Sequence, residues 1–306
     1  MLIGNLRWRL AALLLLAAGC VGCGQNATAQ GMKLVHAERS LYREVLVYEG
    51  RGVRCMCFTR ECRVGRQSCL DLHDADRIVM TYPRMMLTAL YVMPEPAKVL
   101  IIGLGGGTLP IALQHVVPDV RIDVVEIDPA VVKVAKRYFG FAENDSTRAT
   151  VADGRVFVKR ALREGRRYDL IMLDAFDHEY IPEHLLTQEF LSEVKALLSP
   201  GGVLAANTFS ASRLYDHESA TYAAVFPAFF NLKKDNRVII ASNGELPSKE
   251  TLRANSKRFE RVFRRFGFEA ASMLPLFSTK ADWDTNARVL TDQYSPANLL
   301  NLRQRE

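Results

Sequence analysis

The chain reads Val99-Leu-Ile-Ile-Gly103-Leu-Gly105-Gly-Gly107-Thr-Leu-Pro110, and this stretch determines the expected fold. The four apolar residues before Gly103 predict a buried parallel strand. The glycines that follow let the backbone turn sharply and approach a ligand, because no side chain stands in the way. A helical pattern over residues 108–117 begins at once. We therefore expect a strand, a glycine turn and a helix N-terminus around a nucleotide-like ligand.

A second strand is predicted over residues 121–126, and it ends on the carboxylate of Glu126. This residue stands about twenty positions beyond the glycines, where a doubly wound sheet places a carboxylate that accepts ribose hydroxyls. Pro129 suits the first turn of the helix that follows. Glycine turns also occur for structural reasons alone, but the pairing with Glu126 favours a nucleoside-binding site.

Strand and helix patterns alternate from Lys98 onwards, which is typical of a parallel sheet with helices on both faces. The strands are predicted at 98–103, 121–126, 148–152, 168–173 and 201–207, with weaker ones near 236–241 and 270–274, and the clearest helices at 183–198 and 248–266. Before them, β-patterns at 42–48, 53–58 and 67–72 predict a small N-terminal β-domain, joined by a helix over 78–91. The expected fold class is α/β, a doubly wound sheet preceded by a small β-domain.

The composition is that of a globular protein, with 306 residues, 49% hydrophobic and 24% charged. A formal net charge of +6 is modest for this length and does not argue for a nucleic-acid partner. We expect three segments: a signal peptide over residues 1–29, a β-domain with its connecting helix over 35–93, and a Rossmann-like nucleoside-binding domain over 94–306.

The first thirty residues resemble a secretory signal, with two arginines ahead of a short apolar run over residues 10–18. The run is too short to span a bilayer comfortably. Cleavage after Ala29 would leave Gln30 as the N-terminus, whereas a lipobox ending at Cys20 would make that cysteine a lipidated first residue. An uncleaved anchor is the third interpretation. Each of them predicts export to the periplasm or cell envelope.

Four cysteines follow this segment, Cys55, Cys57, Cys62 and Cys69. An even set at close spacing in an exported protein predicts two disulfides, and three pairings are open. Zinc binding is the alternative, but the spacing is not that of a standard zinc finger.

A second informative stretch runs from Tyr168 to Glu183, where a predicted strand is followed by four carboxylates and no Lys or Arg. Because the carboxyl ends of parallel strands meet at one edge of the sheet, these carboxylates should lie beside the glycine turn. They would attract a cationic substrate and could accept a proton from it. For Asp174 and Asp177 we favour this functional interpretation over a capping role. For Glu179 and Glu183 we favour a structural one.

These motifs resemble the spermidine synthase (polyamine aminopropyltransferase) family over about residues 40–298. The resemblance implies a methyltransferase-type, Rossmann-like sheet of seven strands after a β-domain, and it includes the C-terminal segment from Leu290 to Pro296. It implies catalytic roles for Asp174 and Asp177, and substrate contacts for Tyr82 and Asp177. The donor would be bound by Gln67, Gly103, Gly105, Gly107, Glu126, Asp153 and Gly154.

The implied reaction is a transfer in polyamine biosynthesis. An aminopropyl group moves from decarboxylated S-adenosylmethionine to an amine such as putrescine, with no metal. The aspartates would hold the diammonium substrate and then accept a proton from the attacking nitrogen. The expected partner is a small cationic amine and no nucleic acid; membrane attachment through the N-terminus and a homodimer are further expectations.

The sequence departs from the family pattern at four positions in three places. Gly106 stands where the glycine turn usually carries an aspartate, Pro83 and Arg84 replace a histidine and a glutamate, and His178 replaces a proline. An arginine near the amine site would oppose a dication. Three alternatives therefore stay open: a methyltransferase that uses S-adenosylmethionine, a nucleoside- or polyamine-binding protein that has lost turnover, and a disulfide-linked envelope interaction module.

Overall fold

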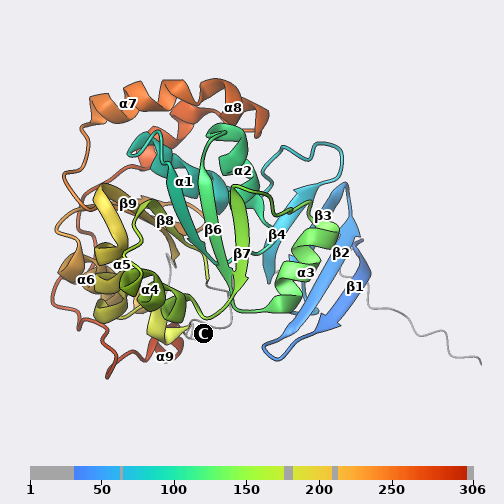
Figure 1. The fold of residues 1–306 in the computed structure, drawn as a ribbon, viewed down its shortest axis with the longest axis horizontal. Coiled ribbons are helices and arrows are strands. Elements are labelled where there is room, and N and C mark those ends of the chain that lie inside the picture. The colour runs from blue at the N-terminus through green and yellow to red at the C-terminus, as the bar shows by residue number, and fades with distance from the viewer. Residues whose placement is uncertain (1–30, 63–64, 176–181, 209–212, 302–306) are drawn as a thin grey trace, which may run out of the picture.

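The computed structural model describes residues 31–62, 65–175, 182–208 and 213–301, so the predicted signal segment lies outside the described residues. Its N-terminal part is an antiparallel sheet of four strands in the order β1-β2-β3-β4. They are β1 (Lys33–Arg39), β2 (Glu44–Gly50), β3 (Val53–Cys57) and β4 (Arg66–Asp71). This small sheet lies beside the larger one (Figure 1).

The larger sheet has seven strands in the order β10-β11-β9-β8-β5-β6-β7. Five of them run parallel: β5 (Lys98–Ile102), β6 (Arg121–Glu126), β7 (Thr147–Val151), β8 (Tyr168–Leu173) and β9 (Leu198–Thr208). The edge is an antiparallel hairpin, β10 (Phe229–Lys233) and β11 (Arg237–Ser242). The predicted fold class is therefore confirmed, whereas the exact domain boundaries stay a prediction.

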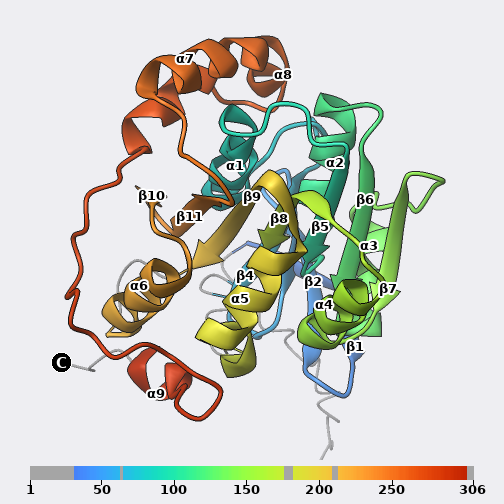
Figure 2. The same cartoon turned by 60° about the vertical axis from the view of Figure 1, so that its left-hand side comes forward.

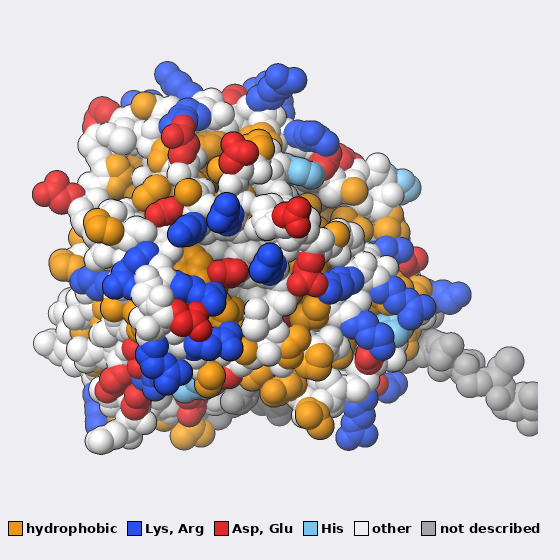
Figure 3. Space-filling view, viewed as in Figure 1, with side chains coloured by type: hydrophobic (Ala, Val, Ile, Leu, Met, Phe, Trp, Pro, Cys, Tyr) orange, Lys and Arg blue, Asp and Glu red, His pale blue; other side chains and the backbone are white. Residues whose placement is uncertain are grey.

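Helices cover both faces of the larger sheet (Figure 2). One face packs against α1 (Thr81–Leu87), η1 (Thr88–Tyr91), α2 (Thr108–Val116), α7 (Lys249–Arg258), α8 (Glu260–Arg265) and the 3₁₀ segment η3 (Ala270–Leu276). The other packs against η2 (Glu183–Leu185), α4 (Gly154–Arg163), α5 (Gln188–Leu197), α6 (Leu214–Val225) and α9 (Ala297–Asn301). Among the described residues, no helix is long and apolar enough to cross a membrane. On the face shown in Figure 3, basic and acidic side chains are mixed with hydrophobic ones.

Helix α3 (Pro129–Tyr138) joins the two sheets, and it lies between them in Figure 1. Its Val131 and Val134 pack against Val45 and Val47 of the small sheet. Asp128 caps the helix by accepting the Ala130 N–H at 2.8 Å, and Pro129 occupies the first turn as predicted. The same carboxylate accepts the Ser40 hydroxyl at 2.5 Å. The small sheet is thus anchored directly beside the end of β6.

The sequence prediction was wrong or incomplete at several elements. Residues 270–274 form part of the 3₁₀ segment η3 and no strand; Ala270 and Met273 are buried at the three-residue spacing that stacks side chains in such a helix. Strands β1 and β10 were missed. The predicted helix over 248–266 divides at Phe259, and the one over 78–91 is the shorter α1 followed by the 3₁₀ turn η1.

The four cysteines are paired as Cys55–Cys69 and Cys57–Cys62. Cys55 and Cys69 stand directly opposite each other on β3 and β4, so the strand register brings them together. Cys57 and Cys62 close the short connection that leaves β3. The register of the hairpin, which the sequence alone did not reveal, thus selects one of the three pairings.

Removing the Cys55–Cys69 disulfide by a double alanine substitution is expected to lower the free energy of unfolding by about 3 kcal/mol. This bond closes a loop with a sequence separation of 14, compared with 5 for Cys57–Cys62, whose removal should cost about 2 kcal/mol. Guanidinium unfolding of the two double variants measures both losses. A smaller loss for Cys55–Cys69 than for Cys57–Cys62 would contradict the loop-closure argument.

Candidate active site

A pocket of about 190 Å³ opens where β5, β6, β7 and β8 end and the small sheet approaches. Eight of the residues singled out from the sequence line it: Gln67, Tyr82, Gly103, Gly105, Glu126, Asp153, Gly154 and Asp174. Gly107 precedes α2 and does not line the pocket. Asp177 lies outside the described residues, as do Glu179 and His178. The pocket therefore brings together most of the predicted site, although the individual roles stay predictions.

Gly103 is where the pocket wall needs a residue without a side chain. Its φ is +98°, and a Cβ atom there would lie 2.2 Å from the carbonyl oxygen of Asp174. The end of β8 passes this close because the Asp174 N–H donates to the carbonyl of Ile102 at 2.8 Å. The glycine thus allows β5 and β8 to deliver their ends to the same pocket.

Glu126 is buried, with 9% of its surface exposed, and both of its carboxylate oxygens accept backbone N–H groups. The donors are Leu104 at 2.9 Å and Asp128 at 3.0 Å. Burial raises the pKa of Glu126, and these two hydrogen bonds oppose that rise. A carboxylate has about four lone-pair sites, so Glu126 can still accept hydroxyl groups from a ligand in the pocket.

Asp153 caps α4 by accepting the Val156 N–H at 2.9 Å. Its other oxygen lies 2.8 Å from Nε2 of His184, which also lines the pocket. A Cβ atom on Gly154 would lie 2.6 Å from Cγ2 of Ile102, so the helix start packs directly on β5. His184 was not predicted from the sequence, because it reaches the pocket only through the η2 turn.

Asp174 ends β8, and its environment is the most unusual in the pocket. Asn207 of β9 donates from Nδ2 to its Oδ1 at 3.0 Å, and the Tyr82 hydroxyl also hydrogen-bonds this carboxylate. Burial raises the pKa of Asp174 to about 7; the two hydrogen bonds lower it, and the charge of Glu126 adds to the rise. A carboxylate with this pKa can gain or lose a proton near neutral pH.

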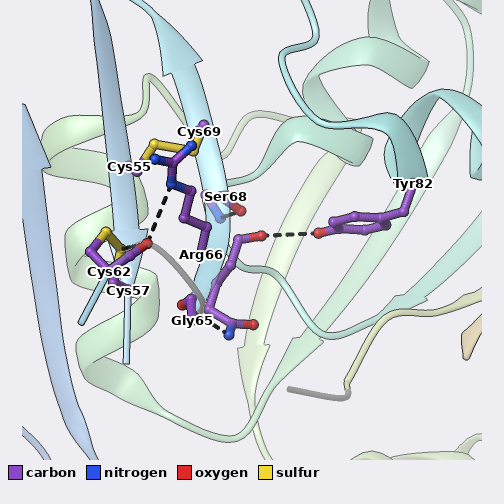
Figure 4. Close-up of a disulfide and its surroundings, with 10 residues drawn as sticks. Cys55, Cys57, Cys62, Gly65, Arg66, Ser68, Cys69 and Tyr82 are labelled. Carbon is purple, nitrogen blue, oxygen red and sulfur yellow. Dashed lines mark hydrogen bonds between the residues drawn. A yellow bond between two sulfur atoms is a disulfide. The ribbon is translucent and has the colours of Figure 1, made fainter. Parts of the chain in front are cut away.

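Strand β4 brings Gln67 to the pocket, and the next two residues of the strand are Ser68 and the disulfide-bonded Cys69 (Figure 4). The Tyr82 hydroxyl lies 3.1 Å from the carbonyl oxygen of Gln67, as the dashed line in Figure 4 marks, so its one proton is shared between this carbonyl and Asp174. Ser68 accepts the N–H of Gly106 at 2.8 Å through its hydroxyl. The small sheet is thereby connected both to α1 and to the glycine turn of the large sheet.

Three other pocket residues were missed, namely Tyr42, Arg43 and Phe58. All three come from the small sheet and its connections. The Arg43 guanidinium stacks over the Phe58 ring, 4.3 Å from its centroid, and its charge opposes the rise in the pKa of Glu126. No spacing in the sequence links these residues to Glu126, because only the docking of the two sheets brings them together.

The expectation that Arg84 opposes a bound dication was wrong. Its guanidinium Nε donates to the carbonyl of Ile78 at 2.8 Å and stacks 5.8 Å from the centre of the Phe268 ring. Arg84 does not line the pocket. Its charge points into the packing around α1, so the departure at this position leaves the pocket free of that cation.

Glu183 and the C-terminal segment form a structural clamp next to the pocket. Oε1 of Glu183 accepts the backbone N–H of Asn298 at 3.0 Å and its side-chain amide at 3.1 Å. Asp292 accepts two hydrogen bonds from Arg155 of α4, at 2.6 and 2.8 Å. These contacts agree with the structural interpretation of Glu183, and they fix the chain on either side of His184.

Gly106, where an aspartate was expected, is closely packed. A Cβ atom there would lie 2.9 Å from Cβ of Ser68 and 3.0 Å from Cδ1 of Phe139. Gly106→Asp is therefore expected to lower the free energy of unfolding by about 1–3 kcal/mol. Thermal unfolding tests this, with Gly244→Ala as a control because its nearest atom would lie at an ordinary 3.5 Å. Equal stability of Gly106→Asp and the parent protein would show that this space can open.

Comparison with known proteins shows similarity to spermine and spermidine synthases. The sequence pattern of the Spermine/spermidine synthase domain matches residues 79–229. A Polyamine aminopropyltransferase of Vibrio vulnificus is 47% identical over 272 residues, which are 87% of this chain and 91% of that protein.

Two solved structures extend the comparison. Human Methyltransferase-like protein 13 in complex with SAH is 27% identical, with a TM-score of 0.55 over 60% of this chain and 93% of that chain. A spermidine synthase in complex with the transition-state analogue AdoDATO is 21% identical, with a TM-score of 0.59 over 81% of this chain and 86% of that chain. At this identity the second likeness shows the fold.

Proposed function

The chain belongs to the spermine/spermidine synthase family, and we propose that it transfers an aminopropyl group from decarboxylated S-adenosylmethionine to a polyamine such as putrescine. It is a transferase of the polyamine aminopropyltransferase type. The observation that carries the proposal is the placement of Asp174, with its pKa raised to about 7 by burial, in the same pocket as Glu126.

The reaction needs an uncharged amine and a held donor. The amine nitrogen attacks the carbon next to the donor's sulfonium, a new carbon–nitrogen bond forms, and the carbon–sulfur bond breaks. The electron pair of that bond stays on sulfur, and methylthioadenosine leaves as a neutral thioether. Before the attack, Asp174 is placed to accept the proton of the substrate ammonium, which frees the lone pair of the nitrogen that attacks. Holding both substrates in one pocket supplies much of the remaining rate gain.

We assign the donor side of the pocket to the carboxylate at the end of β6 and the one that follows β7. Glu126 would accept the ribose hydroxyls, and the Asp153–Gly154 pair would lie at the adenine. Gln67, Gly103 and Gly105 would complete this side, whereas Tyr82 and Asp177 would contact the amine. What supports these roles is that all of them except Asp177, which is not among the described residues, line one pocket.

A second candidate is methyl transfer from S-adenosylmethionine. The observation that favours it is the 27% identity to a methyltransferase solved with SAH. Gly106 is relevant, because an aspartate usual in aminopropyltransferases is absent there. Both candidates share the nucleoside half of the pocket, so the donor decides between them.

Export to the periplasm or envelope, with or without a lipid anchor at Cys20, stays part of the proposal. The arginines and apolar run of the first thirty residues support it, and so does the pairing of Cys55, Cys57, Cys62 and Cys69. Membrane attachment through the N-terminus and a homodimer are two further proposals. Neither alters the chemistry derived for the pocket.

Donor dependence tests the function. The protein, with its disulfides formed, is incubated with decarboxylated S-adenosylmethionine and putrescine, and separately with S-adenosylmethionine and a mixture of amines. Mass spectrometry should find methylthioadenosine in the first reaction and no S-adenosylhomocysteine in the second. S-adenosylhomocysteine with a methylated amine would move the protein to the methyltransferases, and nucleoside binding without any product would make it a binding protein.

A further inference from the structure

We propose that Asn207, itself oriented by Asn236, is a positioning residue that holds the Asp174 carboxylate in place for the attacking amine. The inference rests on the proposed role of Asp174 as the base. It goes beyond that role because it concerns two residues that do not line the pocket.

The geometry is a chain of two side-chain hydrogen bonds. Asn207 lies one residue before the end of β9 with only 7% of its surface exposed, and its Nδ2 donates to Oδ1 of Asp174 at 3.0 Å. The other end of the same amide, Oδ1, accepts from Nδ2 of Asn236 at 3.1 Å. Both polar ends of Asn207 therefore have partners, as a buried amide requires.

The second hydrogen bond determines which end of Asn207 faces Asp174. The two ends of an amide have the same shape, but only the NH₂ end can donate to a carboxylate. If the amide turned over, its oxygen would face an oxygen of Asp174, and the two would repel each other. Because Asn236 offers an N–H donor, it pairs with the oxygen of Asn207 and leaves the NH₂ for Asp174.

Asn236 is held in turn by the tight connection between β10 and β11. The backbone carbonyl of Asn236 accepts the backbone N–H of Lys234 at 2.9 Å, and this hydrogen bond closes the turn. Val238 of β11 pairs with Asn207 of β9, so the Asn236 side chain is delivered next to Asn207 by the strand register. The edge hairpin, of which the sequence predicted only β11, thus contacts Asp174 through the two amides.

The charged surroundings of Asp174 explain why one donor matters. Among the described residues, the titratable groups that act on Asp174 are Tyr82 from α1 and Glu126 from the end of β6. Tyr82 has a pKa well above its usual value because of burial, so it remains a neutral hydroxyl. No described cation pairs with Asp174, and Asn207 is one of the two side chains that stabilise its ionised form. The other residues with titratable side chains that line the pocket are Tyr42, Arg43, Asp128, Asp153 and His184.

The test is the pH at which Asp174 loses its proton, followed in the protein with its disulfides formed. Asn207→Leu keeps the volume of the side chain and removes the donor, so the midpoint should rise by about one to two pH units from about 7. Asn236→Ala should shift it in the same direction by less. Carbon-13 NMR of labelled aspartate gives this midpoint without any turnover, with the Asp174 signal assigned by its absence in Asp174→Asn.

A matched control and a double variant complete the design. Asn243 follows β11 at the end of the β9–β11 pair that is far from Asp174, and its side chain donates to the carbonyl of Ser199 at 3.3 Å. Because it has no contact with Asn207, Asn243→Ala should leave the midpoint unchanged. Asn207→Leu combined with Asn236→Ala should shift it no further than Asn207→Leu alone, since both act through one amide.

Two results would overturn the proposal. The first is an unchanged midpoint in Asn207→Leu, and the second is an additive shift in the double variant. Because the NMR titration reads Asp174 directly, it remains informative if aminopropyl transfer is absent. A shifted midpoint together with silent turnover would contradict the proposed function and leave the positioning of Asp174 intact.

Discussion

Replacing Asp174 with asparagine should lower kcat by about 10²- to 10⁴-fold and leave donor affinity nearly unchanged. The substitution keeps the shape of the side chain but removes the group that accepts the proton of the amine. The donor is expected to be held by Glu126 and the glycine turn, which the substitution does not alter. Steady-state kinetics measure kcat. Calorimetric titration with methylthioadenosine, the part of the donor that remains after transfer, measures the affinity of the donor side of the pocket.

The pH dependence sharpens this prediction. Asp174 must be ionised to accept a proton, and burial raises its pKa to about 7. The rate of the parent protein should therefore rise as the pH increases through about 7, and Asp174→Asn should lack this limb. A parallel loss of turnover and of nucleoside affinity in Asp174→Asn would contradict the assignment, since it would mean that the residue serves the donor or the fold.

Replacing Glu126 with glutamine should weaken nucleoside binding by about 10- to 100-fold. Both oxygens of Glu126 accept backbone N–H groups, from Leu104 and Asp128. The NH₂ of glutamine would face one of these donors, so the side chain would have to turn away from its present position. One or two hydrogen bonds from the ribose to a charged acceptor would be lost at the same time.

The control for this prediction is Glu183→Gln. Glu183 holds the backbone and side chain of Asn298 and does not line the pocket, so its substitution should leave methylthioadenosine affinity unchanged. Calorimetric titration of both variants gives the comparison. Equal affinity of Glu126→Gln and the parent protein would remove the ribose assignment.

Much of the large sheet could be predicted because its signals are local. The apolar run before Gly103 and the acidic end of the next strand mark β5 and β6, and parallel strands place their carboxyl ends at one edge. That rule was sufficient to bring Glu126 and Asp174 together, whereas Asp153 was indicated only by the family resemblance. Strands β1 and β10 were missed because their sequences show no strong alternation of apolar and polar residues. Each is the edge strand of its sheet.

The rest of the pocket depends on contacts between distant segments. Asn207 lies within an ordinary buried strand, and nothing in the sequence around it indicates that its amide meets Asp174. Arg43 and His184 reach the pocket only because the small sheet and the η2 turn lie against the edge of the large sheet. The disulfide pairing likewise required the register of β3 and β4, in which Cys55 faces Cys69.

The most direct test of aminopropyl transfer follows the transferred carbons. Decarboxylated S-adenosylmethionine, labelled with carbon-13 in its aminopropyl group, is incubated with unlabelled putrescine and the protein with its disulfides formed. We predict labelled spermidine and unlabelled methylthioadenosine in equal amounts, both strongly reduced with Asp174→Asn. Recovery of the label only in unreacted donor, with the protein folded and the donor bound, would contradict the account.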